Sequence, residues 1–228
     1  MKKTKEEKLK KGENFSYFLV YHRIPFFEQK RYYLIMELYV VRHGKTIWND
    51  MRKLQGIADI NLNEKGIADA KALGLSLMDT HFDAIYSSPL ARAKNTAELI
   101  RNGRDIPIIC DPRLIEINFG DYEGKIFEYL LENTGFKAFF DDPEHYIPPA
   151  NGETFPSVLE RTKNFLTEVI EKQKENGRYM VVAHGALNAA LTSNLEKRPL
   201  SQYWGKGLQK NCEAIVYTKD GDEWKKKE

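Results

Sequence analysis

Two stretches of the sequence end a short apolar run with the same His-Gly pair. Leu38–Val41 leads into Arg42-His43-Gly44, and Tyr179–Ala183 leads into His184-Gly185. A histidine side chain can be a base, a metal ligand or a nucleophile, and a guanidinium group matches the shape of a phosphate or carboxylate. One Arg-His-Gly triplet is weak support for a site, but its partial repetition indicates that both histidines serve the same chemistry.

The apolar runs predict how these histidines are positioned. Neither run alternates apolar with polar residues, which is typical of a parallel strand buried on both faces. Open α/β sheets keep their ligand crevices at the carboxyl ends of such strands. We therefore expect His43 and His184 to lie at one edge of the sheet and to share a pocket with Arg42 and Arg92.

Arg92 follows another predicted strand, 83–87. Ser88 is a good N-cap and Pro89 fits a first helical turn, so Arg92 would lie near a helix N-terminus, where free N–H groups favour anions. It could equally be a solvated arginine on an amphipathic helix. The residues alone leave both interpretations open.

Glu116 is the candidate acid, followed by an unusual insert. Its neighbours Leu114, Ile115 and Ile117 are apolar, and burial favours a neutral carboxyl group, which can act as a general acid. The alternative is a loop carboxylate that caps a neighbour.

The insert, residues 125–151, is rich in aromatic and acidic residues, and we expect it to be a small helical cap over the sheet edge.

The remaining pattern predicts an α/β fold. Asn63 would cap a helix that begins at Glu64, a third strand would span 106–110, a helix would run from Phe155 towards Gly177, and another would begin near Ala186. Residues 212–218 would form the last strand, before a turn and a frayed Lys-rich tail. We expect a three-layer α/β/α sandwich with a mostly parallel central sheet and the insert over the active site.

Composition and charge limit the function classes. The 228 residues carry a formal net charge of +2. Residues 1–35 hold nine Lys/Arg against four Glu, a net +5, and the remainder has 26 basic and 29 acidic residues, a net −3. The body is therefore not expected to bind nucleic acid. No apolar run reaches the roughly 18 residues of a membrane span, and no signal-peptide cleavage site follows the leader. Cys110 and Cys212 lack metal-site spacing, so we expect reduced thiols and a cytoplasmic location.

The first 35 residues form a basic, aromatic extension. It is a docking arm for an anionic surface, a disordered or loosely docked tail, or an artefact of start-site choice, because Met36 immediately precedes the first strand. We expect residues 36–228 to form one catalytic domain. Of the histidines outside the motifs, His22, His81 and His145 are expected at the surface, with His145 retaining a small chance of substrate contact.

Taken together, the motifs resemble the histidine phosphatase superfamily, in its phosphoglycerate mutase-like branch of α-ribazole and broad-specificity phosphatases. The resemblance covers about residues 36 to 218 and keeps the family order. It rests on the following segments: Arg42-His43-Gly44-Lys45-Thr46-Ile47-Trp48-Asn49, Leu54-Gln55-Gly56, Leu62-Asn63-Glu64-Lys65-Gly66, Ser87-Ser88-Pro89-Leu90-Ala91-Arg92-Ala93, Glu116 with Phe119-Gly120-Asp121-Tyr122-Glu123-Gly124, and His184-Gly185.

The resemblance implies a phosphohistidine mechanism. His43 would attack phosphorus, Arg42, Arg92 and His184 would hold the equatorial oxygens, and Glu116 would protonate the leaving oxygen and then activate water. Phosphate-binding roles also follow for Asn49, Gln55, Gly56 and Gly185. Two guanidinium groups and a charged His184 beside a neutral His43 would suit phosphoryl transfer. We expect no metal and no cofactor.

The resemblance leaves three functions to compare. Mutases of the family have a longer insert with basic residues that hold a phosphoglycerate carboxylate, whereas this insert is short and acidic, which favours hydrolysis of a small phosphorylated metabolite. Arg52 and Lys53, near the mouth of the expected active site, could bind a second anionic group. A mutase or a sugar-bisphosphate phosphatase therefore stays an alternative. A non-catalytic phosphate-ester-binding regulator is disfavoured because every catalytic position is filled. Lys45 replaces an acidic residue common in the family and would add positive charge beside the phosphate. The oligomeric state is open, with a homodimer among the states considered.

Overall fold

A six-stranded mixed sheet forms the centre of the structure, a computed structural model that describes residues 35–228. The strand order is β3-β2-β4-β1-β5-β6. The four strands β1 to β4 pair in parallel, whereas β5 runs antiparallel to β1 and β6 antiparallel to β5. Their bounds are β1 Met36–Arg42, β2 Ala84–Ser87, β3 Ile108–Cys110, β4 Arg178–Ala183, β5 Ala214–Asp220 and β6 Glu223–Lys226.

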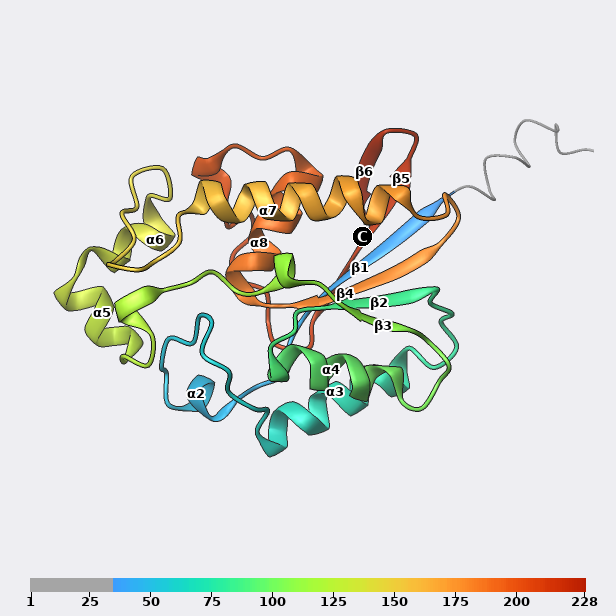
Figure 1. Cartoon of the computed structure of the whole chain (residues 1–228), viewed down its shortest axis with the longest axis horizontal. Coiled ribbons are helices and arrows are strands. Elements are labelled where there is room, and N and C mark those ends of the chain that lie inside the picture. The colour runs from blue at the N-terminus through green and yellow to red at the C-terminus, as the bar shows by residue number, and fades with distance from the viewer. Residues whose placement is uncertain (1–34) are drawn as a thin grey trace, which may run out of the picture.

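Helices cover both faces of this sheet (Figure 1). Helices α3 (Glu64–Ser76) and α4 (Ala91–Arg101) lie on one face, and α7 (Phe155–Glu168) and α8 (Gly185–Glu196) lie on the other. The predicted three-layer α/β/α sandwich is therefore confirmed. Among the described residues no helix has the length and apolar character needed to span a membrane.

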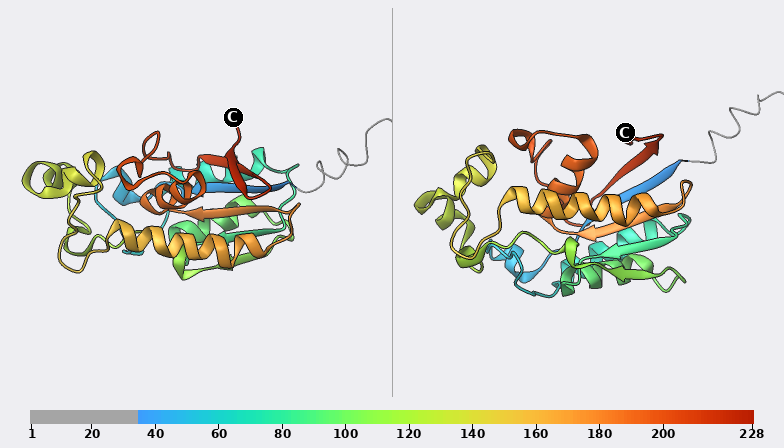
Figure 2. Two further views of the ribbon diagram at one scale, coloured as in Figure 1. Left: turned by 90° about the horizontal axis from the view of Figure 1, so that it is seen from above. Right: turned by 45° about the horizontal axis from the view of Figure 1, so that its top comes forward.

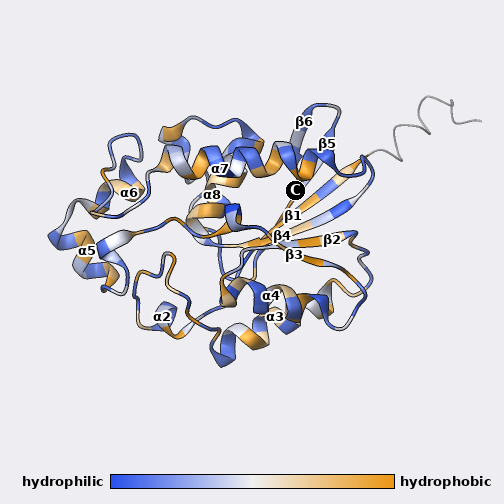
Figure 3. Cartoon of the chain, viewed as in Figure 1, coloured by the Kyte–Doolittle hydropathy of each residue, from blue (hydrophilic) through white to orange (hydrophobic). Residues whose placement is uncertain are grey.

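Alternate residues of the central strands enter two separate cores. Val40 and Val181 pack in the cluster that includes α7 and α8, whereas Val41 and Val182 pack in the cluster that includes α4. All four side chains are fully buried. Figure 3 shows hydrophobic and hydrophilic segments alternating along α7, as expected of a helix with one face on the sheet. This explains why the strands read as continuous apolar runs.

The predicted cap lies at the end of the molecule beyond the carboxyl ends of the parallel strands (Figures 1 and 2). It contains α5 (Phe127–Asn133), the 3-10 helix Gly135–Lys137 and α6 (Ala138–Asp141). Its core is aromatic: the rings of Phe136 and Phe139 stack with their centroids 5.1 Å apart, and both side chains are buried. Phe139 also stacks on Phe155 of α7 with centroids 4.8 Å apart, so aromatic packing anchors the cap to the sandwich.

Several local predictions need correction. The Lys-rich end is not a frayed tail: residues 223–226 return from a turn as β6, where half-buried Trp224 packs against the core. Ser88 does not cap α4, because that helix begins at Ala91 and its N-cap is Leu90. Pro89 therefore precedes the helix instead of opening it. The long helix ends at Glu168 and is followed by the 3-10 helix Ile170–Lys172.

Other boundaries agree more closely. Asn63 caps α3 by accepting a hydrogen bond from the Gly66 backbone N–H, and α8 begins one residue before the predicted position, at Gly185. A short helix, α2 (Ile47–Asp50), was not expected; Thr46 and Asn49 form a capping box at its N-terminus. Predictions about residues 1–34, including His22, lie outside the described part of the chain.

Candidate active site

Arg42 and His43 lie where β1 ends, and His184 lies where the neighbouring parallel strand β4 ends. The imidazole centroids of the two histidines are 5.1 Å apart, so the two strand ends meet at one edge as expected. A cavity of about 280 Å³ opens beside His43. Of the predicted site residues, the following border it: Arg42, His43, Asn49, Gln55, Gly56, Glu116 and Gly185.

The hydrogen bonding of His43 defines its reactive atom. Its Nδ1 lies 2.6 Å from the carbonyl oxygen of Gly44, which can only accept, so Nδ1 carries the proton and Nε2 keeps a lone pair. Burial, followed by the positive charges of Arg92 and Arg42, lowers the pKa of His43 well below 6.5. The residue is therefore a neutral imidazole with a free nucleophilic nitrogen.

Arg92 is fully buried, which excludes the solvated-arginine interpretation. Its Nη1 and Nη2 donate to the carbonyl oxygens of Ala58 (2.7 Å) and Gly56 (2.6 Å), and its Nε donates to His184 Nδ1 at 3.2 Å. Arg92 and His184 are fully buried and do not border the cavity, so the expectation that they share a pocket with His43 and Arg42 is not met for these two residues. Each terminal nitrogen of Arg92 has a second hydrogen available for an anion.

The structure describes His184 before a phosphate binds, so the opposite charges expected of the two histidines during catalysis stay a prediction. Because Arg92 donates to Nδ1 of His184, the neutral ring carries its proton on Nε2 and donates it to Ser88 Oγ at 2.8 Å. Burial, then the positive charge of Arg92, lower the pKa of His184 well below 6.5. Both histidines are therefore neutral here. An incoming phosphate dianion would favour protonation of His184.

Arg42 holds an unused hydrogen-bond donor at the cavity. Its Nη1 donates to the Gln209 carbonyl oxygen at 2.6 Å, whereas its Nε is buried and finds no acceptor among the described residues. Burial lowers the pKa of Arg42, and the negative charge of Glu116 opposes that change. A phosphate oxygen in the cavity is the kind of acceptor that would satisfy this donor.

Glu116 is buried, but its surroundings are not simply apolar. Its carboxylate accepts backbone hydrogen bonds from Ile117 (3.0 Å), Ala186 (3.2 Å) and Leu187 (2.8 Å). Two of these donors belong to the first turn of α8, so the carboxylate sits at a helix N-terminus, a location that attracts negative charge. The expectation of a purely apolar environment for Glu116 is corrected accordingly.

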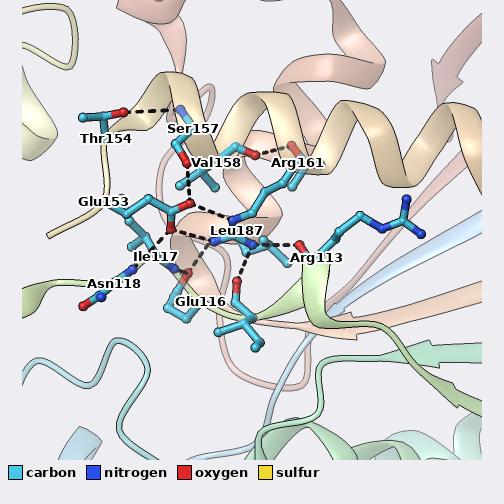
Figure 4. Close-up of polar contacts among 12 residues, drawn as sticks. Arg113, Glu116, Ile117, Asn118, Glu153, Thr154, Ser157, Val158, Arg161 and Leu187 are labelled. Carbon is cyan, nitrogen blue, oxygen red and sulfur yellow. Dashed lines mark hydrogen bonds and ion pairs between the residues drawn. The ribbon is translucent and has the colours of Figure 1, made fainter. Parts of the chain in front are cut away.

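A half-buried ion pair supports the segment that carries Glu116 (Figure 4). Arg161 of α7 binds Glu153 through two hydrogen bonds of 2.9 and 3.0 Å. Its Nη1 also donates to the carbonyl oxygens of Arg113 (2.7 Å) and Ile115 (2.6 Å). These carbonyls directly precede Glu116, so Arg161 and Glu153 position it from the α7 side.

Glu123 organises the loop around Arg92, a role that the sequence did not reveal. Its carboxylate accepts from the backbone N–H groups of Ile57 and Ala58, both at 2.8 Å, and from that of Phe119 at 3.2 Å. Gly56 has φ +55°, which strains any residue with a side chain, and a Cβ there would lie 1.9 Å from Glu123 Oε1, so a substitution would displace that carboxylate. The same loop supplies the carbonyls that hold Arg92.

The polar residues Asn49 and Gln55 border the cavity with part of their hydrogen bonding already used. Asn49 Oδ1 accepts from the backbone N–H of Thr46 in the α2 capping box, which leaves its amide nitrogen as a donor. Gln55 Oε1 accepts from Thr46 Oγ1 at 2.9 Å. Because the amide oxygens hold these contacts, the amide nitrogens are the groups that could donate to a ligand.

Two other expectations are resolved by position and a third is not. His145 is exposed and bonds Asp142 at 2.9 Å, and it does not border the cavity; the alternative of substrate contact is not supported. His81 is exposed, as expected. Lys45 is half-buried and does not border the cavity, so the charge that it would add beside the phosphate stays a prediction.

Gln209 is a further residue that the sequence pattern missed. It is buried, its Nε2 donates to the carbonyl oxygens of Val40 and Glu213, and its Oε1 accepts from Asn188. The sequence carried one indication of its position. The segment that precedes a strand antiparallel to β1 must lie at the carboxyl end of β1, and Gln209 is in the segment before β5. Among the described residues, no group of three or more His, Cys, Asp or Glu side chains is placed to hold a metal ion.

Comparison with known proteins agrees with this geometry. Residues 38–228 match the family model of the histidine phosphatase superfamily (branch 1). Phosphoserine phosphatase 1 of Hydrogenobacter thermophilus is 32% identical over 188 residues, covering 82% of this chain and 88% of the relative. The adenosylcobalamin/α-ribazole phosphatase of Salmonella typhimurium is 31% identical, covering 79% and 90% respectively.

Mutases and solved structures are also among the similar proteins. A probable phosphoglycerate mutase GpmB of Erwinia tasmaniensis is 32% identical, with 71% of this chain and 75% of the relative covered. The structure of Bacillus stearothermophilus YhfR superimposes with a TM-score of 0.77 at 34% identity, covering 84% of this chain and 95% of that one. With a family match across almost all of the described chain, the protein belongs to the histidine phosphatase superfamily.

Proposed function

We propose that the protein is a metal-independent phosphomonoesterase that hydrolyses a small phosphorylated metabolite through a phosphohistidine on His43. The observation that carries the proposal is the bond from His43 Nδ1 to the Gly44 carbonyl oxygen. It orients the ring, sets the tautomer and leaves Nε2 as the nucleophile. The relatives named as phosphatases support hydrolysis over the mutase and regulator alternatives.

In the first step, His43 Nε2 attacks phosphorus and an N–P bond forms as the bond from phosphorus to the ester oxygen breaks. Glu116, in its protonated form, gives its proton to the departing alkoxide, which leaves as an alcohol. Arg42 and Arg92 compensate the charge on the equatorial oxygens, with His184 as a further donor. The buried Nε of Arg42 gains an acceptor in this step.

In the second step, water attacks phosphorus and the N–P bond breaks. The Glu116 carboxylate takes one proton from the water as inorganic phosphate forms, and His43 returns to its neutral form. The group that donates in the first step thus accepts in the second. The backbone donors of α8 keep the carboxylate oriented throughout.

The test compares the full-length chain with its His43→Ala and His145→Ala variants on an aryl phosphate in the presence of EDTA. We expect turnover by the wild type and by His145→Ala, whose imidazole is exposed and outside the cavity. His43→Ala should lose at least about a thousandfold in kcat, because the nucleophile is gone. Acid-labile, alkali-stable radiolabel on the wild type after rapid quenching would identify the N–P intermediate.

The binding partner, the cellular location and the oligomeric state are further predictions. We propose that the protein binds a small-molecule phosphate ester and does not bind nucleic acid. A cytoplasmic location and a homodimer stay predictions from the sequence. Cys110 and Cys212 are both free thiols, which is compatible with a reducing compartment.

A further inference from the structure

Aromatic rings form part of the cavity wall. Phe127 of α5, Phe140 of α6 and Trp204, which follows the 3-10 helix Leu200–Gln202, all border the cavity and are half-buried. Neighbouring rings such as Phe136 and Phe139 are almost completely buried and serve the cap core. The three half-buried rings therefore keep surface available for a ligand.

Contacts within the protein hold this wall in place. Phe140 and Trp204 stack with centroids 5.0 Å apart and an interplanar angle of 27°, and Phe127 meets Phe140 edge to face at 5.6 Å. The Trp204 indole N–H donates to the carbonyl oxygen of Phe139 at 2.7 Å. Because its one polar hydrogen is already used, Trp204 offers the cavity an apolar surface.

The two cations at the mouth are already occupied. Arg52 Nε donates to the Glu128 carboxylate, and the backbone N–H of Phe127 bonds the Arg52 carbonyl oxygen at 2.8 Å, which fixes this pair beside the wall. The Lys53 ammonium lies 5.8 Å from the centroid of the Trp48 ring, a cation–π distance. A second anionic group on a substrate would therefore meet a compensated guanidinium and the charge of Glu128.

We propose that the substrate is a phosphate monoester of a neutral, flat, apolar alcohol, whose ring or unsaturated portion packs on Phe127, Phe140 and Trp204. This inference rests on the proposed phosphatase function and names its substrate class. The cavity of about 280 Å³ is small for a ligand pocket, so it fits a phosphoryl group with one compact ring system. Esters that carry an additional carboxylate are disfavoured by Glu128.

The test measures kcat/KM for 1-naphthylmethyl phosphate (the naphthyl ester), ethyl phosphate and O-phosphoserine, which are all esters of primary alcohols, so that leaving-group basicity differs little. For the wild type we expect the naphthyl ester to exceed both others by at least about tenfold, because only the naphthyl ring contacts the wall. Phe127→Ala and Trp204→Ala should each lower the ratio of naphthyl to ethyl values by about tenfold. The ratio is insensitive to partial misfolding, which lowers both values together.

Tyr129→Ala is the matched control. Tyr129 is on the same helix as Phe127 but is 56% exposed and does not border the cavity, so its ratio should equal that of the wild type. Equal kcat/KM values for the naphthyl ester and ethyl phosphate in the wild type would overturn the inference, as would an unchanged ratio in both aromatic variants. If no ester were hydrolysed by the folded enzyme, the proposed function itself would fail.

Glu128→Gln tests the charge argument separately. Removing the carboxylate frees Arg52 to bind a substrate anion, so we expect kcat/KM for O-phosphoserine to rise about two- to fivefold relative to the naphthyl ester, as for a partly exposed ion pair. The double variant Arg52→Ala/Glu128→Gln should lose this gain. No gain in the single variant would refute the role assigned to Glu128.

Discussion

Arg161→Ala removes four hydrogen bonds that hold the segment before Glu116. Two join Arg161 to Glu153 and two cap the carbonyl oxygens of Arg113 and Ile115. The side chains of Arg161 and Glu153 are only 19% and 18% exposed. The substitution therefore leaves a largely buried carboxylate without its partner as well as two carbonyl groups without donors, and both stability and the position of Glu116 should suffer.

The magnitude follows from the degree of burial. Breaking a fully buried ion pair costs about 3–5 kcal/mol, and the residual exposure of both groups reduces this to roughly 2–4 kcal/mol. For a domain of this size, each kcal/mol lowers Tm by roughly 2–4 °C, so Arg161→Ala should lower Tm by about 4–16 °C. Arg161→Lys keeps the charge but loses the bidentate geometry, and should fall between the wild type and alanine.

The assay combines thermal unfolding with steady-state kinetics below the unfolding transition. Because Glu116 is displaced while the phosphate ligands remain, we expect kcat to fall by about tenfold with little change in KM. Lys65→Ala is the control: its ion pair with Asp69 lies on the surface of α3, and both Tm and kcat should stay at wild-type values. A Tm within 1 °C of the wild type, or an unchanged kcat, would refute the positioning role of Arg161.

Two further predictions concern the loop around Arg92 and the buried histidines. Glu123→Gln puts an N–H group against backbone donors of the loop 57–58, so kcat/KM should fall by about tenfold with a modest loss of Tm; wild-type kinetics would contradict the positioning role of Glu123. Folding lowers the pKa of both His43 and His184 below 6.5, so the unfolded chain binds more protons than the folded one as the pH falls below 6.5. Their contribution to stability is present above pH 6.5 and is lost progressively below it. Urea unfolding from pH 7.5 to 5 should therefore show the free energy of unfolding falling as the pH is lowered. A His43→Gln/His184→Gln variant whose free energy of unfolding depends on pH as steeply as that of the wild type would count against this.

The sequence by itself determined the architecture and most of the site. Apolar runs without alternation can be satisfied only by strands covered on both faces, and parallel strands deliver their carboxyl ends to one edge. That logic correctly placed His43 beside His184 and Arg42, with Arg92 near a helix start. The aromatic insert was also correctly assigned to a cap.

The tertiary structure decided which groups support these residues and how they are charged. Glu123 reaches Ile57 and Ala58 across more than sixty residues of chain, and Arg161 reaches Ile115 across 46; no local pattern encodes such contacts. The lowered pKa of His184 depends on its complete burial and on the neighbouring charge of Arg92, and local sequence encodes neither. The order of strands and motifs along the sequence identifies residues that lie at the same edge of the sheet. Desolvation and hydrogen-bond partners arise only when distant segments pack together.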